Sequence, residues 1–116
     1  MLKQLLGKFA EDRAETVLKS AGLKIVARNW RCRQGEIDLI AQDGSTLVFV
    51  EVRSRKHAEF GSAADSITLT KQRRIIAAAR HYLATLNTLP ACRFDAITLD
   101  AGSEPVWIKS AFEDVG

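Results

Sequence analysis

The chain has 116 residues, of which 47% are apolar and 27% charged, and its formal net charge at pH 7 is +3. This size and composition are typical of one soluble globular domain, and we expect residues 1–116 to form it. The sequence has no apolar run long enough to cross a bilayer, no secretory signal and no metal-ligand spacing at Cys32 or Cys92. We therefore expect a cytoplasmic protein without a membrane partner.

The positive charge is unevenly distributed along the chain. After Arg93 one lysine, Lys109, stands against Asp95, Asp100, Glu104, Glu113 and Asp114, so the excess of Lys and Arg lies in the earlier part. A basic body favours a phosphate-rich partner, because Lys and Arg gain affinity by releasing counterions from nucleic acid. It does not require one.

The first expected element is a helix over residues 5–20, where apolar residues recur at helical spacing and Gly22 follows as a stop. Glu11 lies at the border of the apolar stripe, either as a surface acid or as a group that reaches a neighbouring site. A strand is expected over residues 23–27. The stretch after it combines Trp30 with several arginines, which either contact a phosphate backbone or lie in solvent while the indole covers the core.

A β-hairpin is expected next, because two apolar runs flank the pair Asp43-Gly44. With these two residues as the loop, Asp38 pairs with Phe49 and Glu36 pairs with Glu51. Paired residues, and residues two apart along a strand, share a face of the sheet. One face is therefore expected to carry Glu36, Asp38, Glu51 and Arg53 with Ile40, Leu47 and Phe49, and the other Ile37, Leu39, Val48, Val50 and Val52.

Acids that share a partly covered sheet face repel one another and cost free energy to desolvate. Two arrangements offset this cost. A divalent cation can sit between the carboxylates, or the acids can remain solvated and pair with Arg53 and Arg55. The residues alone leave both arrangements open.

The second half of the chain predicts a loop, a helix and two strands. Residues 54–62 read as a mobile loop whose single histidine, His57, has no partner ligand. Thr70 is placed to cap a helix from Lys71 to about Leu86. Strands are expected over residues 93–99 and 106–108, with Asp95 paired to Arg93 or a neighbouring arginine. The predicted order is helix, three strands, helix and two strands.

The motifs Gly35-Glu36-Ile37-Asp38-Leu39-Ile40 and Phe49-Val50-Glu51-Val52-Arg53, with Glu11, Asn29-Trp30-Arg31 and Lys71, resemble the YraN family of small bacterial proteins. The resemblance covers roughly residues 7 to 110. That family is similar to archaeal Holliday junction resolvases and to the PD-(D/E)XK nuclease superfamily. The resemblance implies an α/β, restriction-endonuclease-like αβββαβ core, with a mixed sheet flanked by helices.

The resemblance also implies a site. Asp38 and Glu51 match the superfamily's metal-binding acids, and Glu11 matches an acid on the first helix of junction resolvases. Arg53 stands where the superfamily has its catalytic lysine, and Lys71 is the lysine that would replace it from a neighbouring helix. Arginine stays protonated, so it can stabilise phosphate charge but cannot act as a general base.

These observations predict a Mg²⁺- or Mn²⁺-dependent nuclease acting on DNA, with branched or structured DNA as the candidate substrate. The expected metal-site residues are Asp38, Glu51, Glu11 and Glu36, and the expected catalytic residues are Asp38, Glu51, Arg53 and Lys71. The expected nucleic-acid contacts are Arg31, Arg33, Arg55, Lys56, Arg73 and Arg74. A non-catalytic nucleic-acid-binding module is the alternative, and a homodimer is expected by analogy with junction resolvases.

Overall fold

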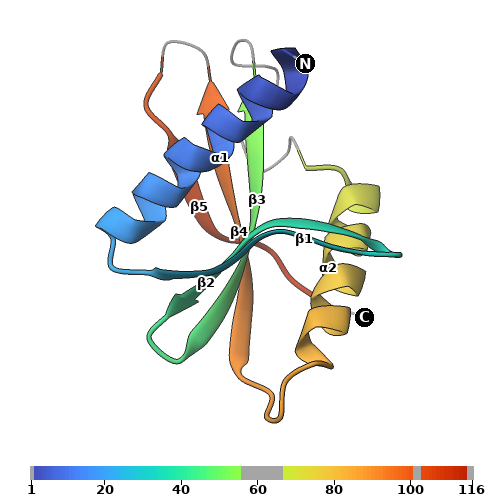
Figure 1. Cartoon of the computed structure of the whole chain (residues 1–116). Helices are drawn as coiled ribbons and strands as arrows, with labels where there is room; N and C mark the ends of the chain where they lie inside the picture. The colour runs from blue at the N-terminus through green and yellow to red at the C-terminus, as the bar shows by residue number, and fades with distance from the viewer. Residues whose placement is uncertain (1, 56–66, 101–102, 115–116) are drawn as a thin grey trace.

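A computed structural model describes residues 2–55, 67–100 and 103–114 of the chain. Its elements are α1 (Leu2–Ser20), β1 (Lys24–Cys32), β2 (Gly35–Asp43), β3 (Thr46–Arg55), α2 (Leu69–Leu83), β4 (Ala91–Asp100) and β5 (Val106–Phe112). The five strands form one sheet with a helix on each face (Figure 1). The α/β class and the expected order of helices and strands are confirmed.

The sheet is mixed, with the strand order β1-β2-β3-β4-β5. Neighbouring strands run antiparallel except β3 and β4, which run parallel. A parallel pair cannot be joined by a tight turn, and α2 lies in the connection between β3 and β4. This crossover brings the start of α2 near the end of β3, where Glu51 and Arg53 lie.

Each helix closes a separate apolar layer against the sheet. On one face, α1 packs Ala10, Ala14 and Leu18 against β2, β3 and β4. On the other face, α2 packs Ile75, Ala78 and Ala79 against a layer that includes Phe49. Within the described part of the chain, neither helix is long and apolar enough to span a bilayer.

The split of the hairpin residues between these layers follows the predicted alternation with one exception. Leu39, Val48, Val50 and Val52 lie on the α1 side, whereas Ile40, Leu47 and Phe49 lie on the α2 side. Ile37 was expected with the first group and instead packs on the α2 side. It lies beyond Leu39, the last β2 residue that is paired with β3, so the alternation of the paired ladder no longer places its side chain.

The loop of the β2–β3 hairpin differs from the prediction. Asp43 pairs with Thr46, so Gly44 and Ser45 form the two-residue loop, and Gly44 has a φ of 60°. Glycine accepts this left-handed conformation at the first loop position of a type II′ turn. The predicted pairs Asp38–Phe49 and Glu36–Glu51 are therefore wrong by two residues, since Phe49 pairs with Ile40. A shift of two preserves every face assignment along a regular ladder.

Other boundaries also differ. Thr68, and not Thr70, caps α2, because its hydroxyl accepts the backbone N–H of Lys71 at 3.1 Å. The first strand extends through Trp30, whose ring meets Tyr82 of α2 edge-on at 5.5 Å between centroids. The contact with Tyr82 favours the interpretation that the Trp30 indole covers the core. Residues 54 and 55 of the predicted loop belong to β3, which continues to Arg55, and the remainder of that prediction, including His57, lies outside the described residues.

Candidate functional site

Asp38 and Glu51 lie where β2 and β3 separate. The last paired residues of the two strands are Leu39 and Val50, so the same register continued by one residue places Asp38 opposite Glu51. The Asp38 carboxylate accepts a hydrogen bond from the backbone N–H of Val52, at 2.8 Å from Oδ2. The two acids thus follow directly after the last pair of the ladder and lie close enough for the charge of Asp38 to raise the pKa of Glu51.

Glu51 is nearly enclosed, with 6% of its surface exposed. Its Oε1 atom lies 3.9 Å from Nζ of Lys71, in the first turn of α2. Its Oε2 atom is buried and has no hydrogen-bond partner among the residues that the structure describes. A buried carboxylate oxygen without a donor is unfavourable, so this atom is open to a positively charged or hydrogen-donating group.

Both carboxyl groups hold their protons more tightly than free acids do. Burial, reinforced by the charge of Asp38, raises the pKa of Glu51 to about 8. Burial also raises the pKa of Asp38 to about 6, against the opposing hydrogen bond from Val52. One buried and one half-buried acid with raised pKa values form a site that gains by receiving positive charge.

Glu11 and Glu36 add negative charge around this pair. Each raises the pKa of Asp38, and Glu36 also raises that of Glu51. Both are engaged elsewhere in the structure: Glu11 accepts from Arg28 and Asn29, and Glu36 pairs with Arg31 at 3.3 Å. Across the described residues, no group of three or more His, Cys, Asp or Glu side chains converges closely enough to hold a metal.

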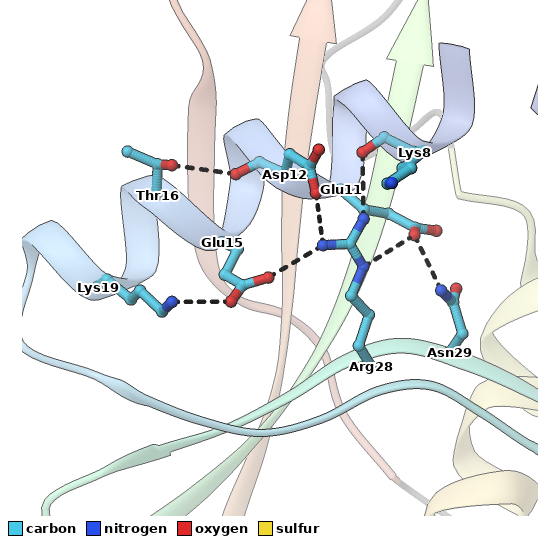
Figure 2. A network of polar contacts seen from close by, with 8 residues as sticks. All are labelled: Lys8, Glu11, Asp12, Glu15, Thr16, Lys19, Arg28 and Asn29. Carbon is cyan, nitrogen blue, oxygen red and sulfur yellow. Dashed lines mark hydrogen bonds and ion pairs between the residues drawn. The ribbon is translucent and has the colours of Figure 1, made fainter. Parts of the chain in front are cut away.

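Arg28 holds Glu11 in place, a role for which no motif in the sequence is specific. Figure 2 shows its guanidinium between α1 and β1, where it contacts Asp12 at 2.6 Å, Glu15 at 3.1 Å and Glu11 at 3.4 Å. It also donates to the backbone carbonyl of Lys8. Three acids on one side of a helix were visible in the sequence, but their shared partner is determined by how α1 packs on β1.

Among the described residues, Lys71 and Arg53 bring positive charge to Glu51. Both lower its pKa, and Lys71 has the larger effect. Lys71 also lowers the pKa of Asp38. The lysine that the resemblance placed on a neighbouring helix thus lies beside the acid pair, together with the arginine two residues after Glu51.

The expected nucleic-acid contacts divide into two groups. Arg31, Arg33, Arg73 and Arg74 have exposed side chains near the β1–β2 hairpin and along α2. Arg31 and Arg74 line one hollow, together with Lys71. The side chain of Arg55 and the whole of Lys56 lie outside the described residues.

Asp95 has a different environment from the acid pair. It is fully buried and accepts hydrogen bonds from Arg93, from the Trp107 indole and from the backbone N–H of Ser110. Arg93 also reaches Asp43 at 3.0 Å. The predicted pairing of Asp95 with Arg93 is confirmed. Asp95 links β4 to β5, and Arg93 links β4 to Asp43 at the end of β2.

Comparison with known proteins adds the family. The model of UPF0102, an uncharacterised protein family, matches residues 10–99. The chain belongs to the UPF0102 family. A UPF0102 protein of Nitrosospira multiformis is 54% identical over 115 residues, covering 97% of each chain. UPF0102 proteins of Cupriavidus metallidurans and Psychromonas ingrahamii are 56% and 50% identical, covering 92% and 93% of this chain and 80% and 89% of theirs.

The match over residues 10–99 includes Asp38, Glu51 and Lys71, so the acid pair and its lysine lie within the part of the chain that defines the family. The expected membership of a YraN-like family is confirmed. The family description names no activity, so a proposed reaction rests on the residues of the site.

Proposed function

We propose that this UPF0102 protein is a divalent-metal-dependent nuclease that acts on DNA, with branched or otherwise structured DNA as the candidate substrate. The observation that carries the proposal is the buried Oε2 atom of Glu51, which has no hydrogen-bond partner among the described residues and lies near Asp38, with Lys71 beside it. The superfamily resemblance supports the same residues, but as an analogy between folds.

The donor set fits a hard cation such as Mg²⁺ or Mn²⁺. Such ions take oxygen ligands and are commonly held by one or two carboxylates, with water and substrate phosphate completing the shell. Asp38 and Glu51 would hold the ion, and Glu36 or Glu11 would orient its water. When bound, the ion supplies polarisation of the scissile phosphate and a water of lowered pKa.

The chain's own side chains then have separate tasks. The backbone N–H of Val52 fixes the Asp38 carboxylate at 2.8 Å, so this ligand is oriented before anything binds. The ammonium group of Lys71, 3.9 Å from Glu51, stabilises negative charge that develops on the phosphate oxygens. Arg53 adds charge from β3 but cannot accept a proton near neutral pH.

The test is cleavage of a four-way junction and a flap DNA by the purified full chain with Mn²⁺. Cleavage should disappear in Asp38→Ala and in Glu51→Gln. The exposed acid Glu104 provides a matched control, since Glu104→Gln removes the same charge away from the site. Lys71→Ala should lower the rate by about 10²–10³-fold, as the loss of one charge-stabilising group does, and Lys71→Arg should restore part of it.

The alternative, a nucleic-acid-binding module without catalysis, is favoured by one observation, the arginine at position 53 in place of lysine. It takes over if the junction binds while Mg²⁺, Mn²⁺ and a range of pH all give no cleavage. If junction and random duplex both fail to bind at about 50 mM salt, where backbone contacts are strongest, neither proposal stands. We also propose a homodimer, by analogy with two-fold symmetric junctions, which sedimentation can check.

A further inference from the structure

A hollow of about 420 Å³ lies where the β1–β2 hairpin meets α2. Its lining side chains and backbone come from Arg31, Cys32, Gly35, Glu36, Lys71 and Arg74. Lys71 belongs both to this hollow and to the acid pair, because its Nζ atom is 3.9 Å from Glu51. The hollow is therefore a direct neighbour of the candidate site.

The hollow carries a surplus of positive charge. Three of its lining residues are cations, and Glu36 is its acid. Glu36 already pairs with Arg31, whose side chain is 73% exposed, and a pair this exposed holds its partners weakly. An anion entering the hollow can therefore displace Glu36 from Arg31 at small cost while it gains Lys71 and Arg74.

A second hollow, of about 600 Å³, lies on the α1 side and shares Arg31 and Glu36 with the first. Its other cations are Lys8 and Arg28, and Glu11 lines it too. The charge of Arg28 is already neutralised by its ion pairs with Glu11 and with two more acids of α1 (Figure 2). The two hollows thus differ in charge, and the one beside α2 is the better anion site.

The cationic hollow is also held in shape. A Cβ atom added at Gly35 would lie 2.9 Å from the backbone carbonyl oxygen of Arg74, so the hairpin and α2 approach as closely as a glycine permits. Arg31 and Arg74, from elements distant in the sequence, are thereby brought to one hollow. Such preorganisation reduces the ordering cost of binding.

We propose that this hollow binds one backbone phosphate of the DNA strand, next to the phosphate that faces Asp38 and Glu51. The naming of DNA rests on the proposed function, whereas binding of the phosphate itself does not require catalysis. Lys71, shared by the two positions, lies between neighbouring phosphates. The strand consequently leaves the acid pair toward α2, and contacts on the α1 side contribute less.

The first experiment is an NMR titration of the ¹⁵N-labelled full chain without divalent metal, using inorganic phosphate and thymidine 3′,5′-bisphosphate. Amide shifts should concentrate at Cys32, Gly35, Lys71 and Arg74. Arg74→Gln should weaken bisphosphate binding by about tenfold, the effect of losing one charge-assisted hydrogen bond. Arg13→Gln removes the same charge from an exposed position on α1, outside the hollow, and should weaken it less than about twofold.

The second experiment measures DNA binding by Arg31→Gln and Arg74→Gln. Both should weaken it more than Arg13→Gln, which removes an exposed charge from α1. The amide spectrum of each variant confirms that it is folded. Shifts that concentrate at Gly7, Lys8 and Asn29, or equal losses from Arg13→Gln and Arg74→Gln, would overturn the inference.

The outcomes also separate this inference from the nuclease proposal. Phosphate binding at the hollow, together with selective loss of DNA binding in the two variants, supports the inference even if no DNA is cleaved. Cleavage of DNA at the wild-type rate by Arg31→Gln and Arg74→Gln would overturn it and leave the nuclease standing. Binding of free phosphate without any change in DNA binding would also overturn it, because the hollow would then serve a small anion.

Discussion

Asp38 accepts the backbone N–H of Val52 at 2.8 Å, just beyond the last paired residues of β2 and β3. The Asp38 side chain thus accepts a backbone hydrogen bond from β3 where β2 and β3 are no longer paired with each other. The hydrogen bond orients one carboxylate, while the other, Glu51, has a buried oxygen that finds no hydrogen-bond partner in the described part of the chain. The arrangement of these two carboxylates determines how stability should depend on pH and on a divalent cation.

The metal-free protein should lose stability as the pH rises. The pKa values of Asp38 and Glu51 are raised on folding, to about 6 and about 8, so the native state binds more protons than the unfolded chain between about pH 4 and pH 8. The free energy of unfolding therefore falls with pH across this window. Urea unfolding in EDTA from pH 5 to 9 measures it.

Glu51→Gln should flatten much of this slope and raise stability at pH 8 by an amount on the order of 1–3 kcal/mol, because the buried charge is gone. The double variant Asp38→Asn with Glu51→Gln should flatten it further. A free energy of unfolding that increases from pH 5 to pH 8 would contradict the assignment of these two acids as a buried, proton-retaining pair.

Mg²⁺ or Mn²⁺ should stabilise the wild-type protein, because an ion that binds only the native state adds about 2.7 kcal/mol at a hundred times its dissociation constant. Thermal unfolding with increasing MnCl₂ measures this effect without any nuclease substrate. Asp38→Asn and Glu51→Gln should each remove most of the increase. The exposed control Glu104→Gln should keep it, and an equal increase in all variants would place the ion elsewhere.

Arg28→Met should destabilise the protein by about 1–3 kcal/mol. The side chain is 26% exposed, and its loss leaves Glu11, Asp12 and Glu15 together without their shared cation. Lys19→Met, which breaks an exposed pair with Glu15 on the same helix, should change the free energy by less than about 0.5 kcal/mol. Urea unfolding of both variants makes the comparison, and similar effects would argue against Arg28 as the anchor of α1.

Gly35→Ala should destabilise the protein by about 1–3 kcal/mol, since its Cβ atom would lie 2.9 Å from the Arg74 carbonyl oxygen. The hairpin would have to move away from α2 and would widen the cationic hollow. Gly7→Ala is the matched control. Its Cβ meets nothing within 4 Å and replaces a helical glycine, so it should be neutral or stabilising by up to about 1 kcal/mol.

Asp95→Ala should be the most damaging of these changes, at about 3–5 kcal/mol. The variant leaves the Arg93 guanidinium and the Trp107 indole N–H without their buried acceptor. Thermal unfolding measures the loss, and the quenching of Trp107 fluorescence reports the local change. A loss below about 1 kcal/mol would show that water replaces the carboxylate.

The amino-acid sequence by itself determined the order of the elements and the faces of the paired hairpin residues from Leu39 to Ala41 and from Leu47 to Val50. Within the paired ladder, face assignment depends only on whether residue positions differ by an even number, so for these residues it survived the two-residue error in the hairpin register. The glycine in Asp43-Gly44-Ser45 located the turn. The register depends on whether Asp43 or Ser45 is the other residue of the loop. The local sequence pattern did not distinguish these two possibilities.

Only the tertiary structure decided which charges meet. Lys71 reaches Glu51 because the crossover returns α2 to the end of β3, and Arg28 gathers three acids because α1 packs across β1. Ile37 changed layers where the paired ladder of β2 and β3 ended. The two ionic contacts join residues far apart in the chain. Their distances depend on how whole helices pack on the sheet, and the local periodicity of the sequence does not predict that packing.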